Sequence, residues 1–454
     1  FYKQTQQYSK TGYTHSNNKG IAMQPTPIDL IINCRWLIPI IPKNQIMEHH
    51  AIAIKSGRIL EVLPIETAAD KYIANCTENL DHHVVMPGLI NSHVHAAARL
   101  FKGHDCSKTT TVGNQLLADQ SFIAASTELA IAEMLKSGIT CYADKQYANN
   151  QLIESVQHSG IRSQLNFALH EKPTDFGSDV SEYLHQGLKL RDYCSSYPLI
   201  QIVCNLNSIN ELTDSTLERL ASYVNELELP LHIQCNTGSD EIQQSLKLWS
   251  STPIQRLFDA GLLIPESQLV NVSGFEDQDL ALIKQSNCHL VISPQTNLVK
   301  PSMTKSIKTL METENNISLA TSCADNRYDL WPELQAITQL VAANSANMTQ
   351  NDIAHQALRM ATINGAKTLG LEAETGSIEP QKYADIIAIE INSLSYQPLY
   401  NLPAQLIANN ASQQVTHSWV AGNALLDNRK LCQLDEHNLI QSAQDWGNKV
   451  QTIN

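Results

Sequence analysis

A regular alternation of short apolar runs with amphipathic stretches constrains the fold of this chain more than any other feature. Eight runs have the length and composition of buried strands, and they lie at 84–90, 140–143, 163–169, 199–206, 231–235, 269–273, 289–293 and 317–321. Helical patterns lie between them, at 122–136, 217–227, 254–262, 280–284 and 334–343. Eight alternations over about 250 residues predict an α/β fold, a parallel (β/α)8 TIM barrel. A doubly wound open sheet is the alternative, but no glycine-rich phosphate loop follows a run, which disfavours a nucleotide-binding version.

The two ends of the chain carry strand patterns outside this alternation. They lie at 28–37, 51–54, 59–63, 385–390 and 415–426, with turn signals at Ser56-Gly57 and Ala421-Gly422. We expect both ends to form one small β-sandwich domain beside the barrel. The expected organisation is a polar tail (1–26), the barrel (84–370), the two parts of the β-domain that flank it (27–83 and 371–431) and a C-terminal segment (432–454).

Length, charge and cysteine usage exclude several classes of protein. The 454 residues are enough for a large barrel with a satellite domain. The formal net charge of −14 argues against nucleic-acid or anionic-membrane partners, which need a surplus of lysine and arginine. Ten cysteines without a C-x-x-C pair indicate reduced thiols in a cytoplasmic protein. No apolar run reaches the length of about 18 residues that a membrane-spanning helix needs, and residues 1–24 lack the apolar core of a signal peptide.

A pair of histidines ends the run from Val84 to His95, which reads VVMPGLINSHVH. Side chains alternate along a strand, so His93 and His95 are expected to point to the same face. Two neutral imidazoles in this arrangement suit a divalent metal such as zinc. Two hydrogen-bonded core histidines are the alternative for an isolated His-x-His pair. His93 and His95 are therefore candidate metal ligands.

Several longer motifs in this chain resemble the amidohydrolase superfamily. They are MPGLINSHVH at 86–95, RLFKG at 99–103, EMLKSGIT at 133–140 with Asp144, PQTNL at 294–298, ATINGAKTLG at 361–370 and GSIEPQKYAD at 376–385. Within the superfamily, the chain is most similar to the branch that contains cytosine, guanine and methylthioadenosine deaminases and the triazine chlorohydrolases. The resemblance covers residues 27–431 and implies the same barrel fold.

The resemblance also implies a metal-dependent chemistry. In this branch one zinc or iron is held by the histidine pair of strand 1, a histidine on strand 5 and an aspartate after strand 8. The metal lowers the pKa of its bound water to about 7. A glutamate after strand 5 and a histidine on strand 6 move protons, and a strand-4 histidine contacts substrate. The implied reaction is hydrolysis of a non-peptide C–N bond of a heterocycle, and the resemblance allows a homodimer.

This chain departs from the family pattern at each of these positions except the histidine pair. Neutral polar residues stand in their place: Asn207 on strand 4, Gln234 and Thr237 at strand 5, Asn271 on strand 6 and Ser322 after strand 8. Two imidazoles fall short of the three protein ligands of a catalytic zinc. Without a metal, unpaired buried carboxylates would be costly, whereas amides and hydroxyls keep hydrogen-bonding capacity. We therefore assign no catalytic residue, expect no tightly bound metal, and predict an inactive or impaired member with a polar pocket for a small polar heterocycle.

An active metal-dependent hydrolase or deaminase with relocated ligands is the alternative hypothesis. His232 lies on the same face of strand 5 as Gln234, and Asp325 follows strand 8 closely, so both are pocket residues that could complete a zinc or other divalent-metal site. His170 and Asp144, at the ends of strands 3 and 2, also face the predicted mouth, where a structural role is the simpler interpretation.

Overall fold

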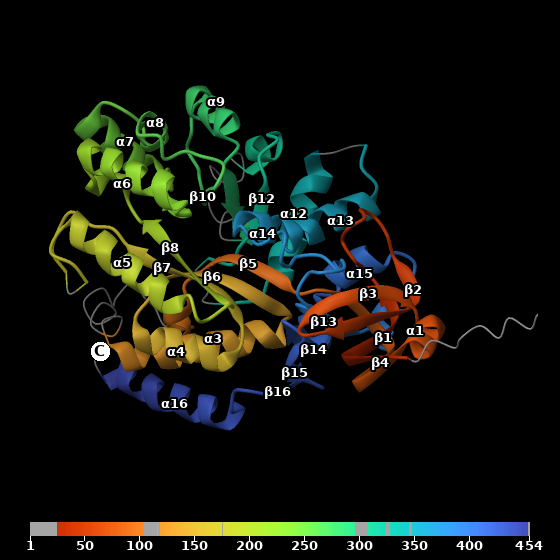
Figure 1. The fold of residues 1–454 in the computed structure, drawn as a ribbon. Helices are drawn as coiled ribbons and strands as arrows, with labels where there is room; N and C mark the ends of the chain where they lie inside the picture. Colours follow the sequence, from red (N-terminus) through yellow and green to blue (C-terminus); the bar gives the residue numbers. More distant parts are fainter. Residues whose placement is uncertain are drawn as a thin grey trace, which may run out of the picture.

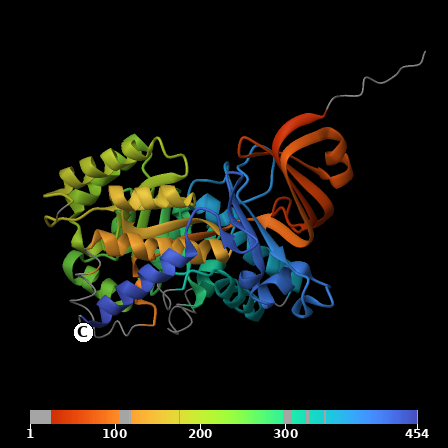
Figure 2. The same ribbon diagram turned by 90° about the horizontal axis from the view of Figure 1, so that it is seen from below.

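The computed structural model describes residues 25–103, 116, 119–174, 176–295, 307–322, 327–344 and 347–452. Two eight-stranded sheets organise this part of the chain. Figures 1 and 2 show one sheet surrounded by helices and the other at the opposite side of the molecule. Residues 1–24 of the expected polar tail lie outside the described residues. Within these residues, no helix has the length and apolar character needed to cross a membrane.

The first sheet consists of parallel strands that pair in chain order. They are β5 (Leu89–Val94), β6 (Ile139–Tyr147), β7 (Arg162–Ala168), β8 (Ile200–Leu206), β9 (Leu231–Gln234), β10 (Ser267–Val270), β11 (His289–Ile292) and β12 (Ile317–Leu319). Sequential parallel pairing with intervening helices is the topology of a (β/α)8 barrel, because a crossover must return each chain segment to the same end of the sheet. The predicted barrel is confirmed.

A seam of hydrogen bonds between β5 and the chain just after β12 closes this sheet. The backbone N–H of Ser322 donates to the carbonyl oxygen of His93 at 3.0 Å, and Val94 and Ser322 form a parallel bridge. The Asn91 amide donates to the Thr321 hydroxyl at 2.9 Å and accepts from the Thr321 backbone N–H at 3.1 Å. The first and last strands of the barrel therefore meet through side chains as well as through the backbone.

The helices around the barrel begin where the sequence provides capping groups. Thr213 accepts from the Thr216 backbone N–H at the start of α6, and Thr252 with Pro253 starts α8. The helices that follow the strands are α3 (Gln120–Lys136), α4 (Asn150–Ser159), α5 (Val180–Cys194), α6 (Asp214–Leu227), α7 (Ser239–Trp249), α8 (Pro253–Asp259), α9 (Asp277–Ser286), α12 (Trp331–Asn344), α13 (Gln350–Met360) and α14 (Ile363–Thr368).

The second sheet combines both ends of the chain, as predicted. Its spatial order is β16-β15-β14-β13-β4-β1-β2-β3. The strands are β1 (Thr26–Leu37), β2 (Met47–Lys55), β3 (Arg58–Pro64), β4 (Tyr72–Pro87), β13 (Ile386–Glu390), β14 (Val415–Val420), β15 (Asn423–Asp427) and β16 (Lys430–Leu431). Short helices α1 (Ile65–Lys71) and α15 (Leu402–Ala408) complete this region.

The apolar run expected as one strand over 84–90 is divided between the two sheets. Val84 pairs with Ile389 of the second sheet, whereas Leu89 pairs with Ile139 of the barrel. The chain passes from one sheet to the other at Gly88, where an added Cβ would collide with the Thr140 side chain. Only glycine permits this close approach. A continuous apolar run therefore conceals a change of sheet.

The C-terminal segment forms the helix α16 (Glu436–Thr452), which lies along α3 (Figure 1). The Trp446 ring meets the edge of the Phe122 ring at a centroid distance of 5.3 Å. The Lys136 ammonium lies 2.7 Å from the Glu436 carboxylate. Aromatic packing of this kind contributes more than the exposed ion pair, so α16 is attached to the barrel chiefly through its apolar face.

A buried ion pair connects the barrel to the second sheet. The Arg162 guanidinium, at the start of β7, donates to both carboxylate oxygens of Asp385, at 2.7 and 3.2 Å. Asp385 directly precedes β13 and also accepts from the Ala421 backbone N–H at 2.8 Å. Both charged side chains are almost fully removed from solvent, with 3% and 0% exposure.

Loss of one partner of this pair should destabilise the protein strongly. For Asp385→Ala we expect the free energy of unfolding, measured by urea denaturation, to fall by about 3–5 kcal/mol, because Arg162 stays buried without its counter-charge. The control is Glu48→Ala, which removes the exposed Arg35–Glu48 pair and should cost less than about 1 kcal/mol. Equal losses in the two variants would contradict a special role for the buried pair.

A buried carboxyl group predicts a pH dependence of stability. Glu333, in the first turn of α12, is 3% exposed and accepts from the Gln295 backbone N–H at 2.8 Å. Burial, with a smaller contribution from Asp329, raises its pKa from the ordinary 4.5 to about 8. Between these two values the folded protein keeps a proton that the unfolded chain loses, so stability falls as the pH rises.

Glu333→Gln should remove this part of the pH dependence. At pH 5 we expect the variant and the wild type to unfold at similar urea concentrations. By pH 8 the variant should be more stable by at least about 1 kcal/mol, since one pKa unit corresponds to about 1.4 kcal/mol. Glu390→Gln, at an exposed position, is the matched control. A Glu333→Gln difference that stays constant across this range would show that the carboxyl group is ionised in the folded protein.

Candidate functional site

The paired histidines meet at the carboxyl end of the barrel. His93 lies in β5 and His95 follows it directly, and their Nε2 atoms are 3.1 Å apart with the ring planes at 86°. His93 is fully buried, whereas His95 lines a cavity at the mouth. The strand alternation that the sequence predicted therefore brings both imidazoles to one point.

Hydrogen bonds that run from His93 through His232 to Gln268 orient the His93 ring. His93 Nδ1 lies 2.8 Å from His232 Nε2, and His232 Nδ1 lies 2.9 Å from Gln268 Oε1. The amide oxygen can only accept, so His232 carries its hydrogen on Nδ1 and accepts on Nε2 from His93 Nδ1–H. The Nε2 lone pair of His93 consequently faces His95. Both ring nitrogens of His232 are engaged, which makes it a residue that orients His93, in the way carboxylates and carbonyls orient metal-bound histidines.

The three imidazoles are held in the neutral form. Burial lowers the pKa of His93 well below its ordinary value, the pKa of His95 to about 3 and that of His232 to about 4. The positive charge of Lys145 acts in the same direction on all three. Neutral imidazoles can hold a metal or accept hydrogen bonds from a ligand.

Asn271 lies next to Ser322, whose backbone is bonded to His93. The Asn271 amide nitrogen is 3.4 Å from the Ser322 hydroxyl, and its amide oxygen accepts from the Ser293 backbone N–H at 3.1 Å. Both residues have left-handed backbones, with φ of 52° and 53°. This conformation suits asparagine and aspartate better than serine, so the backbone at Ser322 is held by the seam rather than by its own preference.

The other predicted pocket residues lie at the ends of β8 and β9. The Asn207 amide contacts the Tyr147 hydroxyl and accepts from the Asn205 amide at 3.0 Å. Half-buried Gln234 ends β9. The Thr237 backbone N–H and hydroxyl both donate to Glu241 Oε2 at 2.9 Å, so a carboxylate from α7 lies next to this position. Asp325 lies outside the described residues.

A catalytic zinc requires three protein ligands and a water molecule. In the described ranges no three His, Cys, Asp or Glu side chains converge on one point. His93 and His95 supply two nitrogens, and the positions that the family resemblance assigns to the other functional groups hold the neutral Gln234, Asn271 and Ser322. The residues described at the mouth therefore do not form a complete zinc site.

Some buried polar atoms towards the carboxyl ends of the barrel strands have no hydrogen-bond partner among the described residues. They include Asp144 Oδ2, Asn166 Oδ1, Asn205 Oδ1 and both amide atoms of Asn236. Burial raises the pKa of Asp144 to about 6.

Sequence reasoning missed Lys145, Gln268 and Glu241 at this site. The sequence does mark Lys145 as a candidate, since this charged residue directly follows a run of apolar residues and Asp144. Gln268 and Glu241 are revealed only by their partners across the barrel. Together with His95, Gln146 and Tyr147, Lys145 lines a cavity of about 310 Å³.

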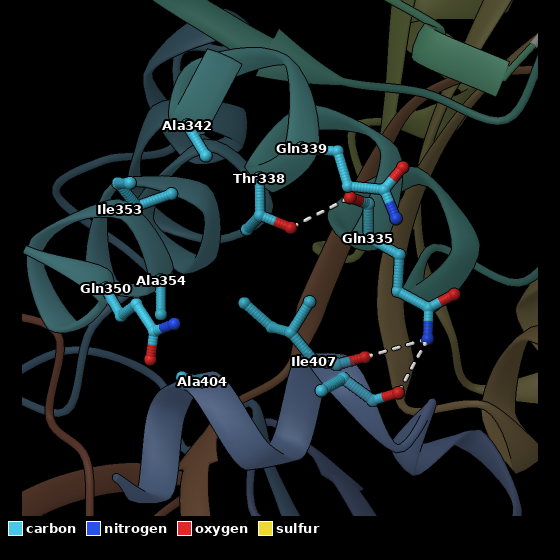
Figure 3. A pocket seen from close by; sticks show the side chains of 10 residues that line it. Gln335, Thr338, Gln339, Ala342, Gln350, Ile353, Ala354, Ala404 and Ile407 are labelled. Atoms are coloured by element: carbon cyan, nitrogen blue, oxygen red, sulfur yellow. Dashed lines mark hydrogen bonds between the residues drawn. The ribbon is translucent and has the colours of Figure 1, made fainter. Parts of the chain in front are cut away.

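A second cavity, of about 480 Å³, lies between α12, α13 and α15, away from the mouth (Figure 3). Gln335 and Thr338 from α12 contribute to its wall, and the Gln335 amide donates to the Ile407 and Ala408 carbonyl oxygens at 3.0 and 3.1 Å. Its lining residues include no acid, base or thiol. This cavity therefore lacks the groups that proton transfer needs.

Comparisons with known proteins agree with the fold. The profile of the amidohydrolase family matches residues 84–425. The chain is 35% identical over 438 residues to a 5-methylthioadenosine/S-adenosylhomocysteine deaminase of Teredinibacter turnerae, covering 94% of this chain and 98% of the relative. It is 26% identical to a 5'-deoxyadenosine deaminase of Methanosarcina mazei, covering 92% and 97%.

A solved structure of an adenosine deaminase from Xanthomonas campestris with bound zinc superimposes with a TM-score of 0.87 and 27% identity, covering 94% of this chain and 100% of that one. An atrazine chlorohydrolase from Arthrobacter aurescens shares the fold, with a TM-score of 0.79 at 17% identity and coverage of 92% and 100%.

The orienting chain predicts the effect of Gln268→Met. Without the amide oxygen, the Nδ1–H of buried His232 loses its acceptor at a cost of about 1–3 kcal/mol. We expect the hydrogen bond between His232 and His93 to reverse its direction, so that His93 carries its hydrogen on Nε2 instead of Nδ1. Long-range ¹H–¹⁵N spectra of ¹⁵N-histidine-labelled protein report this directly. Gln335→Met, in the remote cavity, should leave the spectra unchanged, and unchanged His93 signals in Gln268→Met would refute the assigned orientation.

Proposed function

The chain belongs to the amidohydrolase family, and from this premise we propose that it is a deaminase-like member whose barrel mouth binds a small polar heterocycle without hydrolysing it. The observation that carries the proposal is that the residues assigned to the site beside the histidine pair are uncharged. Gln234, Asn271 and Ser322 occupy the places where the family resemblance puts a histidine ligand, a proton-transfer histidine and an aspartate ligand.

Hydrolysis of an aromatic C–N bond at neutral pH requires an activated water. In related enzymes the metal lowers the pKa of that water to about 7. A carboxylate then transfers protons, which the Thr237 hydroxyl is unable to do near neutral pH. The Glu241 carboxylate lies next to this position, but its Oε2 already accepts two hydrogen bonds from Thr237.

The residues that replace the family's charged or metal-binding groups are all neutral and polar. Asn271 and Ser322 are 6% and 4% exposed and are hydrogen-bonded to each other. An aspartate at position 322 in a metal-free mouth would be a buried anion, and its ionised form would be strongly disfavoured. Amides and a hydroxyl keep donors and acceptors without that penalty. This pattern supports a site maintained for polar binding.

The class of ligand follows from the groups that remain. Asn205, Asn207 and Asn236 present amide donors and acceptors at the mouth, and Tyr147 adds an aromatic face. Such groups pair with the ring nitrogens and exocyclic groups of a purine-like heterocycle. The relatives named above are deaminases of adenosine derivatives, which is consistent with a nucleoside-like ligand.

A metal-dependent hydrolase is the second candidate. The 3.1 Å separation of the two Nε2 atoms is close to that of two nitrogens bound to one tetrahedral zinc, for which Zn–N distances of about 2.0–2.1 Å are usual. Such an enzyme would need a further ligand from outside the described residues, and Asp325 is the candidate.

Metal content and activity distinguish the two candidates. After dialysis against a chelator, the wild type should hold well below one equivalent of zinc or iron by elemental analysis. It should show no turnover of adenosine, methylthioadenosine, guanine or a chlorotriazine. Stoichiometric zinc that survives dialysis, or metal-dependent turnover, would establish the hydrolase instead.

A variant with Gln234→His, Thr237→Glu, Asn271→His and Ser322→Asp tests whether the barrel still supports the family chemistry. It should bind about one zinc, because two changes complete a three-His, one-Asp set and aspartate suits the left-handed backbone at 322. Single reversions should change little, since such groups act as a unit. Activity should stay weak because Asn207 remains. Failure of the folded quadruple variant to bind zinc would contradict the ligand positions assigned here.

A further inference from the structure

A third cavity lies at the end of the barrel opposite to the histidine pair. It has a volume of about 330 Å³ and lies where β12 begins and α13 ends. Ile317, the first residue of β12, lines it, whereas Ser322, which is bonded to His93, follows the last residue of that strand. The cavity is therefore separate from the mouth, and the proposed function gives it no role.

Two cationic side chains from separate segments line this cavity. Lys43 belongs to the loop between β1 and β2, and Arg359 to the last turn of α13. No acidic residue is among the described residues of the lining. The helix dipole favours a cation in the last turn of a helix, which accounts for Arg359 but not for Lys43. In a chain with a formal net charge of −14, a general surplus of basic residues does not explain the pair either.

Hydrogen bonds on both sides of Lys43 attach its loop to α13. Arg359 Nη1 donates to the Ile40 carbonyl oxygen at 3.2 Å, and the Asn44 amide donates to Asp352 Oδ1 at 2.8 Å. The backbone at Lys43 is therefore held at the cavity before any ligand arrives. Such preorganisation lowers the entropic cost of binding.

The charges of the two cations are not neutralised by a bound carboxylate. Hydrogen bonds from Thr349 and Asn44, with a smaller contribution from the Lys43 charge, lower the pKa of Asp352. The Asp352 oxygens accept from the Asn44 amide and, at 2.7 Å, from the Thr349 hydroxyl. Within the part of the chain that the structure describes, no carboxylate forms an ion pair with Lys43 or Arg359. Both cations are available to an anionic ligand.

The neutral residues of the lining add hydrogen-bonding groups of both kinds. The Gln356 amide, from α13, has no hydrogen-bond partner among the described residues. The Thr313 hydroxyl and the Asn364 amide nitrogen donate to backbone carbonyl groups at 2.7 and 3.0 Å, which leaves their oxygens as acceptors. Met311 and Met360 supply an adaptable apolar wall. The lining thus combines donors for an anion with acceptors for hydroxyl groups.

We propose that this cavity binds a phosphate monoester of a small hydroxylated molecule, with Lys43 and Arg359 contacting the phosphate and Thr313 and Asn364 accepting from hydroxyl groups. A phosphate monoester carries about −1.5 to −2 charges at pH 7, which matches two cations better than the single charge of a carboxylate. A guanidinium group also fits phosphate oxygens in a bidentate manner. The volume suits a ligand of the size of a pentose phosphate, since small-molecule pockets begin at about 300 Å³.

The test is a titration of the full chain with ribose 5-phosphate at constant ionic strength, followed by calorimetry and by spectra of ¹³C-methyl-labelled methionine. We expect saturable binding of one equivalent that shifts the Met311 and Met360 signals but not that of Met134, which is buried in α3. Lys43→Met, at an exposed position, should weaken binding at least tenfold, and Lys43→Arg should bind within threefold of the wild type. Lys189→Met, which removes an exposed charge from α5, should bind as the wild type does.

Three further ligands separate the contributions of the phosphate and the hydroxyl groups. Ribose should not bind, and inorganic phosphate and ribonate should each bind at least threefold more weakly than ribose 5-phosphate. Tighter binding of ribonate would overturn the assignment of a phosphate, and equal binding of inorganic phosphate would overturn the hydroxyl contacts. Absence of saturable binding, unshifted Met311 and Met360 signals, or equal binding by Lys43→Met would overturn the site itself. None of these outcomes depends on the metal content of the mouth.

Discussion

The seam between β5 and the chain after β12 is the constraint on which the rest of the site depends. Parallel strands leave no hairpin between the first and the last strand, so closure relies on contacts between residues more than 220 positions apart. The Ser322 N–H to His93 C=O bond and the Asn91–Thr321 pair make these contacts. They fix the backbone that carries His93, and they hold Ser322 in a left-handed conformation beside it.

The chemistry of the mouth follows from burial within that closed barrel. His93, His95 and His232 are neutral because desolvation disfavours their charged forms. Gln268 then selects which nitrogen of each ring carries a hydrogen. In the same low-dielectric setting, neutral replacements at Asn271 and Ser322 are tolerated where an unpaired carboxylate is not.

The terminal sheet and α16 stabilise the barrel from outside. The Arg162–Asp385 pair joins the start of a barrel strand to the start of β13, and Gly88 lets the chain cross between the sheets at close range. The α16 helix covers α3 through Phe122 and Trp446. The Arg162–Asp385 pair and Gly88 lie at the amino ends of barrel strands, so this part of the scaffold can persist while the residues of the mouth change.

Local patterns in the sequence determined the barrel, the two-ended second sheet and the common face of His93 and His95, because side-chain periods and strand–helix alternation depend only on neighbouring residues. The neutral residues of the site were assigned through the family resemblance. The tertiary structure decided what those patterns do not contain. Strand pairing split the run at 84–90, since a run of apolar residues does not specify its partner. Likewise, the contact of His232 with His93, the role of Gln268 and the position of Lys145 depend on distances across the barrel. Those distances are set by register between strands far apart in the chain.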